Sequence, residues 1–212
     1  MILPPDLSPG HRIATTSEDL DQMVREMRGS DVRGVDFETS GLRYWAGQLP
    51  VGYSMGFWDR GPRAWYVPFD HRTWDVQADP DKAKAAFRDA LQGATGIVGH
   101  NLKFDLKMAR AGGWELPKDV PIHDTLIQAS LIDEAQSFGL EKVVARLGCG
   151  PYGDPFAGKD VVTERIRDLA RDRKLGIKGY LDRFGHSEIP VGIEGEYACR
   201  DIGHTLALDR AQ

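Results

Sequence analysis

Residues 32–42 read Val-Arg-Gly-Val-Asp-Phe-Glu-Thr-Ser-Gly-Leu, a largely apolar run that ends on two acids and a Ser-Gly turn. This stretch predicts a β-strand over 32–37. Side chains alternate across a strand, so Asp36 and Glu38 share one face while the apolar residues between them point to the other. Two like charges side by side repel each other unless a cation bridges them, which makes the pair a candidate metal site. A strand exit with solvated acids is the simpler alternative.

Hydrophobic periodicity and turn residues place further elements on both sides of this strand. The first dozen residues, 1–12, are rich in proline and read as a loop, and residues 15–18 read as the capping box of a short helix. The order of elements suits a mixed sheet flanked by helices in one domain over 1–212. Further strands are predicted at 51–58, 64–67, 96–98 and 121–122, and further helices at 82–91, 102–111, 125–132, 140–147, 160–173 and 194–208.

The composition of the 212-residue chain excludes several classes of protein. A net charge of −5 argues against broad neutralisation of duplex phosphates, although an enzyme can hold a few nucleotides through bound metal ions. No stretch reaches the length of an apolar membrane span, and the N-terminus lacks the pattern of a signal peptide. Cys149 and Cys199 are therefore expected to be free thiols in a cytoplasmic protein that has no membrane partner.

Two later segments also carry acids at positions set by helix geometry. In Gly99-His100-Asn101-Leu102-Lys103-Phe104-Asp105, the asparagine suits a helix N-cap and the aspartate follows one turn later. In the last predicted helix, Tyr197 and Asp201 are four residues apart and project from one face. Taken singly, residues 99–105 also read as an ordinary helix cap followed by an exposed acid. Tyr197 and Asp201 also read as a core tyrosine beside a surface acid.

Taken in order, the three segments resemble the exonuclease motifs of the DEDD nucleases, in the subtype whose last motif carries tyrosine (DEDDy). Their flanks look most like the proofreading 3′→5′ exonuclease domains of polymerase I-type (family A) DNA polymerases, bacterial or phage, and the resemblance runs from about residue 30 to the C-terminus. The histidine subtype does not fit, because His186 lies 15 residues before Asp201 and His204 follows it. The resemblance implies an α/β, ribonuclease H-like (DnaQ-like) fold with a mixed five-stranded sheet flanked by helices.

The resemblance also implies a two-metal hydrolysis mechanism. Asp36, Glu38 and Asp201 would hold one divalent ion, and Asp36 and Asp105 would help to hold a second. Tyr197 and Glu38 would orient the attacking water. Ligands that are all oxygen favour Mg²⁺, with Mn²⁺ as a substitute, and two such ions can activate water and stabilise the leaving 3′ oxygen.

The substrate implied is the single-stranded or frayed 3′ end of DNA, released as nucleoside 5′-monophosphates. Thr39, Leu42, Asn101 and Phe104 match substrate-binding positions of the family, although Leu42 also suits plain packing and Asn101 a plain cap. The setting implied is a proofreading domain linked to or associated with a polymerase domain, in the bacterial nucleoid or in the cytoplasm of a phage-infected cell. A stand-alone enzyme trimming DNA or RNA, and an inactive strand-binding module, are the alternatives.

Overall fold

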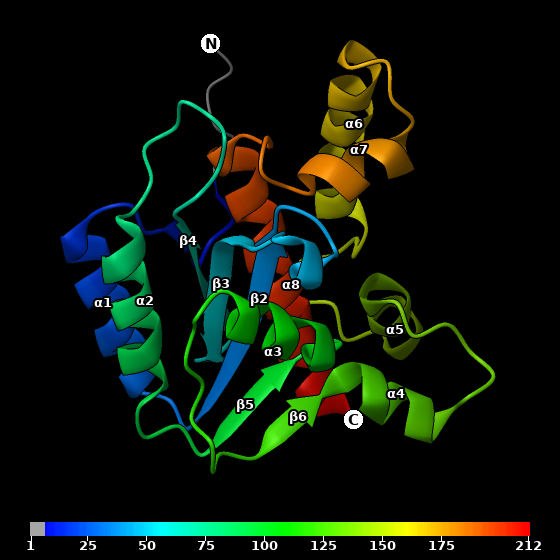
Figure 1. The fold of residues 1–212 in the computed structure, drawn as a ribbon. Helices are drawn as coiled ribbons and strands as arrows, with labels where there is room; N and C mark the ends of the chain where they lie inside the picture. The colour runs from blue at the N-terminus through cyan, green and yellow to red at the C-terminus, as the bar shows by residue number, and fades with distance from the viewer. Residues whose placement is uncertain (1–6) are drawn as a thin grey trace.

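The computed structural model describes residues 7–212, which form one mixed β-sheet covered by helices on both faces (Figure 1). The central strand, β2 (Val32–Thr39), pairs antiparallel with β3 (Pro50–Trp58) and parallel with β5 (Gly96–Gly99), which agrees with the predicted ribonuclease H-like arrangement. The strands in sheet order are β1 (His11–Ile13), β4 (Pro62–Pro68), β3 (Pro50–Trp58), β2 (Val32–Thr39), β5 (Gly96–Gly99) and β6 (Ile122–Asp124).

The sheet has six strands, one more than predicted, because β1 pairs in parallel with β4. The predicted loop over 1–12 is therefore wrong for residues 11 and 12, while residues 1–6 lie outside the described part of the chain. A strand of three residues is too short to show alternation in sequence. Its pairing, with His11 opposite Ala64 and Ile13 opposite Tyr66, supplies the stabilisation instead.

Two helices, α1 (Ser17–Arg28) and α2 (Pro80–Leu91), lie side by side over one face of the sheet (Figure 1). They enclose the larger core, which is centred on Phe37, Tyr53, Phe87 and Trp114. The capping box of α1 is formed by Thr16 and Asp19, one residue later than predicted. Asp19 takes the place of the glutamate or glutamine that is usual at this position of a capping box, and its Oδ2 accepts hydrogen bonds from the backbone N–H groups of Thr15 and Thr16.

The long helix α8 (Val191–Ala211) crosses the opposite face of the sheet. Its Ile202 and Leu206 pack against two strand glycines, Gly34 and Gly56, and a Cβ at Gly56 would overlap Ile202. Glycine in a strand permits this close approach of another element. The position of α8 over β2 is therefore set by the small residues beneath it.

Most of the remaining helices lie on the side of α8 away from α1 and α2 (Figure 1). The prediction missed α7 (Ile177–Phe184), where Gly179 lowers intrinsic helix propensity. Packing of Tyr180 and Phe184 against α6 (Ala157–Asp172) stabilises this helix. None of the helices in residues 7–212 has the length and apolar character that crossing a bilayer requires. The bounds are η1 (Tyr44–Ala46), α3 (Leu102–Ala111), α4 (Thr125–Ile132), α5 (Leu140–Leu147), α6 (Ala157–Asp172) and α7 (Ile177–Phe184).

Candidate active site

The two acids of β2 lie on the sheet face that α8 covers. Asp36 is half-buried and Glu38 is 7% exposed, whereas Val35 and Phe37 belong to the core on the opposite face. The predicted alternation of an acidic and an apolar face is confirmed. The pairing of β2 with β3 also shifts register between Glu38 and Thr39. Bulges of this kind redirect side chains and are common beside active sites.

A third carboxylate comes from the first turn of α3. Asn101 occupies the N-cap in a left-handed conformation, with φ of 66°, and its exposed side chain makes no capping hydrogen bond. Its backbone N–H donates to Asp124 Oδ1 at 2.9 Å, which fixes the turn. One helical turn later, Asp105 is 3% exposed, and its Oδ1 accepts a hydrogen bond from the backbone N–H of Phe37 at 3.1 Å. This bond ties Asp105 directly to the strand that carries the first two acids.

The fourth carboxylate and the tyrosine come from α8. Tyr197 and Asp201 line a cavity of about 340 Å³ together with Asp36 and Asn101. The three segments singled out in the sequence therefore meet at one place. The far rim of the cavity is formed by α5 and α6, where Lys159 Nζ and Glu141 Oε1 form an ion pair of 2.5 Å.

Burial and mutual repulsion raise the pKa of all four carboxylates. Burial, and then the charge of Glu38, raise the pKa of Asp36 to about 7. Burial, and then the charge of Asp36, raise the pKa values of Asp105 and Asp201 well above their usual range. The pKa of Glu38 is raised by burial and by Glu194. The charged forms are thus destabilised, and a cluster of oxygen donors in this condition fits a hard divalent cation, whose charge offsets the repulsion.

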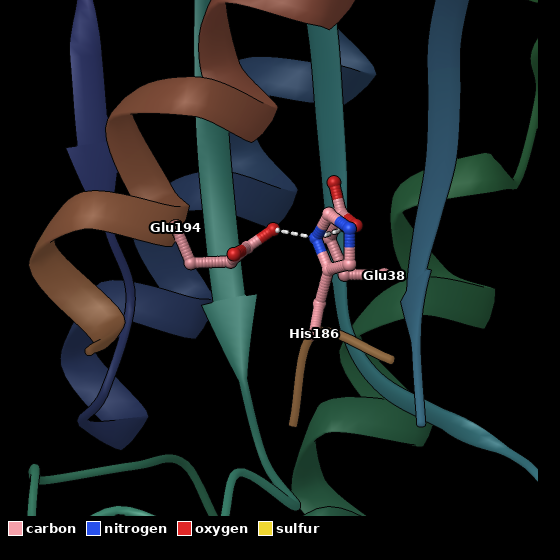
Figure 2. Close-up of side chains that lie close together, drawn as sticks. All are labelled: Glu38, His186 and Glu194. Atoms are coloured by element: carbon pink, nitrogen blue, oxygen red, sulfur yellow. Dashed lines mark hydrogen bonds and ion pairs between the residues drawn. The ribbon is translucent and has the colours of Figure 1, made fainter. Parts of the chain in front are cut away.

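A histidine and a glutamate that the sequence did not single out also belong to this site. His186, in the loop between α7 and α8, points its Nδ1 at Glu38 Oε2, at 3.0 Å, and at Glu194 Oε1, at 2.7 Å (Figure 2). Glu194 could have been found, because residues 194, 197 and 201 fall on one helical face. His186 could not, because it lies in a loop 148 positions after Glu38, where no periodicity constrains it.

The predicted substrate-binding residues are distributed around the cavity rather than gathered inside it. Asn101 lines the cavity, whereas Thr39, Leu42 and Phe104 are not among its lining residues. Leu42 is 60% exposed just beyond the end of β2, and Phe104 is half-buried on α3. Thr39 is buried, and its hydroxyl donates to the carbonyl of Gly41 at 2.8 Å, so it shapes the turn after β2.

The mixed sheet and the convergent carboxylates define a nuclease with a ribonuclease H-like fold. A family model described as 3′-5′ exonuclease matches residues 11–152, and the chain belongs to this exonuclease family of polymerase I-type DNA polymerases. The match includes the acids of β2 and α3, while the tyrosine motif on α8 lies beyond it. The protein is a 3′-5′ exonuclease, and divalent-metal dependence follows from the family.

Two curated relatives agree with this assignment, and one solved structure shares the fold. The chain is 26% identical to DNA polymerase I of Borreliella burgdorferi over 132 residues, 62% of this chain and 14% of that polymerase. It is 35% identical to DNA polymerase DpoZ of Acinetobacter phage SH-Ab 15497 over 101 residues, 47% of this chain and 14% of that polymerase. The catalytic core of RRP6 from Trypanosoma brucei shares the fold, with a TM-score of 0.52 and 16% identity over 94% of this chain and 46% of that one.

Proposed function

We propose that this exonuclease removes nucleotides from the 3′ end of DNA in a proofreading role, with Mg²⁺ as the natural ion and Mn²⁺ as a substitute. The observation that carries the proposal is the convergence of four buried or half-buried carboxylates with raised pKa values from three separate elements. Asp36, Glu38 and Asp201 would hold one ion, and Asp36 and Asp105 would help to hold a second. Bound there, the ions would supply positive charge to activate water and stabilise the leaving 3′ oxygen.

The side chains themselves have two further tasks. Burial and the nearby acid Asp201 raise the pKa of Tyr197 well above its usual range, so its hydroxyl stays protonated and can donate a hydrogen bond to the attacking water. Asp105 keeps its orientation through the Phe37 amide. The exposed side-chain amide of Asn101 makes no capping hydrogen bond, so it is available to bind the nucleic-acid strand near its 3′ end. Leu42 is exposed and can contact the terminal base.

The DNA substrate and the proofreading role rest on the two relatives that are DNA polymerases. This chain spans 14% of the length of each, so a polymerase domain linked or bound to it is part of the proposal. A stand-alone exonuclease with the same site is the second candidate, because the exonuclease family model matches residues 11–152 without any polymerase sequence. A stand-alone exonuclease that trims RNA would differ from the proofreading candidate in the substrate that it prefers.

The test is degradation of 5′-labelled single-stranded DNA and of the matching RNA, with Mg²⁺, with Mn²⁺ and with EDTA. A ladder shortening from the 3′ end of DNA, absent with EDTA and with Asp36→Ala, is the expected result. Asp124→Ala is a poor control because Asp124 fixes the α3 turn, whereas Asp168→Ala changes an exposed acid far along α6 and should leave the ladder intact.

Faster degradation of an oligonucleotide with a mismatched 3′ terminus than of a fully paired one would support proofreading, because fraying exposes single strand for binding. Preference for RNA would favour the stand-alone candidate. Well-folded protein that degrades neither substrate with either ion, yet binds single-stranded DNA, would replace the enzyme proposal with an inactive binding module.

A further inference from the structure

The loop that carries His186 is anchored directly on the end of β2. The backbone N–H of His186 donates to the carbonyl of Thr39 at 2.9 Å. Gly185, just before it, has φ of 52°, and a Cβ at this position would overlap the backbone of Thr39 and Gly41. Only glycine fits this conformation and this contact. This backbone hydrogen bond therefore fixes the position of the loop and places the imidazole of His186 beside Glu38.

A second buried acid, Glu194, faces this imidazole (Figure 2). It is 0% exposed in the first turn of α8, and its Oε1 hydrogen-bonds to Nδ1 of His186 at 2.7 Å. Its other oxygen has no hydrogen-bond partner among residues 7–212. A fully buried carboxylate is costly unless it is paired, so its presence points to a task that requires it. Its hydrogen bond to Nδ1 is a contact that can fix the orientation of the His186 ring.

Nδ1 of His186 faces Glu38 Oε2 at 3.0 Å as well, so one ring nitrogen lies between two acids (Figure 2). Contact through Oε2 leaves the second oxygen of Glu38 unengaged by His186. The ring centroid also lies 6.0 Å from that of Tyr197, so the imidazole lies near the tyrosine that is proposed to orient the attacking water.

We propose that His186 and Glu194 are positioning residues of the exonuclease: Glu194 holds the imidazole, and the imidazole holds Oε2 of Glu38 so that Oε1 is presented to the metal ion and the attacking water. This inference rests on the proposed role of Glu38 as a metal ligand. Mutation of a residue that orients a metal ligand without touching the metal typically lowers metal affinity or activity by about 10–100-fold.

The test compares His186→Ala with His186→Asn, because the amide nitrogen of Asn can occupy nearly the place of Nδ1. Mn²⁺ affinity is measured by calorimetry without nucleic acid, and cleavage of single-stranded DNA by kcat and KM. We expect His186→Ala to lose about 10-fold or more in both Mn²⁺ affinity and kcat with an unchanged KM. We expect His186→Asn to recover most of both losses. His123→Ala, which removes a different histidine–carboxylate pair with Asp209, should match wild type.

Wild-type Mn²⁺ affinity and kcat in His186→Ala would overturn the inference. So would a His186→Asn variant no better than His186→Ala, because the donor would then not be the feature that matters. If His186→Ala does not fold, Glu194→Gln takes its place, and unchanged Mn²⁺ affinity there overturns the inference equally. If wild type binds Mn²⁺ but degrades no nucleic acid, the proposed function fails while the Mn²⁺ titrations still decide the positioning role.

Discussion

Asp105 Oδ1 accepts a hydrogen bond from the backbone N–H of Phe37 in β2 at 3.1 Å, and the carboxyl group also lies near Asp36 of the same strand. The same side chain is 3% exposed, and its pKa is raised well above the usual range by burial and then by Asp36. Asp105 therefore stabilises the fold as a hydrogen-bond acceptor and destabilises it as a charge. The two effects can be separated by substitution.

Asp105→Asn keeps the acceptor for Phe37 and removes the charge. Because a carboxylate whose pKa is raised by folding lowers the free energy of unfolding at neutral pH, we expect the metal-free variant to have a higher free energy of unfolding than wild type. The stabilisation that Mn²⁺ gives to wild type should largely disappear. Urea unfolding at pH 7, with and without Mn²⁺, measures both effects.

Asp105→Ala provides the matched control. It also removes the charge, but it leaves the buried N–H of Phe37 without a partner, which costs about 1–3 kcal/mol. We expect this variant to be less stable than Asp105→Asn by that amount. Equal stabilities for the two variants would contradict the structural role of the hydrogen bond.

The contact between α8 and the sheet predicts a second stability effect. Gly56→Ala would place a methyl group against Ile202 and the carbonyl of Arg63, where there is no room. Overpacking of this kind costs about 1–3 kcal/mol, so a lower urea midpoint with an unchanged slope is expected. Gly61→Ala, in an open turn with nothing near the added carbon, should unfold with the wild-type midpoint. A tolerated Gly56→Ala would mean that α8 can shift on the sheet.

A buried histidine predicts a pH dependence. His204 on α8 is 1% exposed, neither ring nitrogen has a hydrogen-bond partner among residues 7–212, and burial lowers its pKa to about 4. The unfolded chain binds this proton at its ordinary pKa of about 6.5. Stability from neutral His204 is therefore complete above pH 6.5 and is lost as the pH falls toward 4, at about 1.4 kcal/mol per unit.

His204→Phe keeps the edge-on contact with Tyr152 and removes the titration. We expect the free energy of unfolding of wild type, relative to that of the variant, to fall progressively as the pH is lowered from 6.5 to 4.5. Urea unfolding of both proteins at several pH values measures this difference. Because the other titratable groups are common to both proteins, their contributions cancel in the difference. A constant difference between the two proteins across this range would show that His204 does not titrate as its burial implies.

The sequence predicted the parts of the site that regular periodicity controls. Asp36 and Glu38 share a face because strands alternate, and Tyr197 and Asp201 share one because four residues complete a helical turn. The mixed sheet followed from the order of elements. The metal ligands and their roles came from family resemblance, and they remain predictions until the experiments above are done.

The parts that the sequence did not predict depend on contacts between distant segments. The strand β1 has only three residues and exists through pairing with β4. The helix α7 contains a glycine and is stabilised by packing on α6. His186 reaches Glu38 because Gly185 allows its loop to touch β2, a contact that no local pattern encodes.

Tyr197→Phe tests the proposed chemistry most directly, because it removes one hydroxyl and leaves the ring in place. The hydroxyl stays protonated in the site and would donate to the attacking water, so its loss should leave that water poorly oriented. We expect kcat to fall by about 100-fold, as is typical when a group that assists proton transfer or positioning is lost. KM for single-stranded DNA and Mn²⁺ affinity should change much less than kcat, because the hydroxyl is neither a proposed metal ligand nor a proposed contact to the strand. A fall in Mn²⁺ affinity as large as the fall in kcat would instead assign Tyr197 to holding the ion through Asp201.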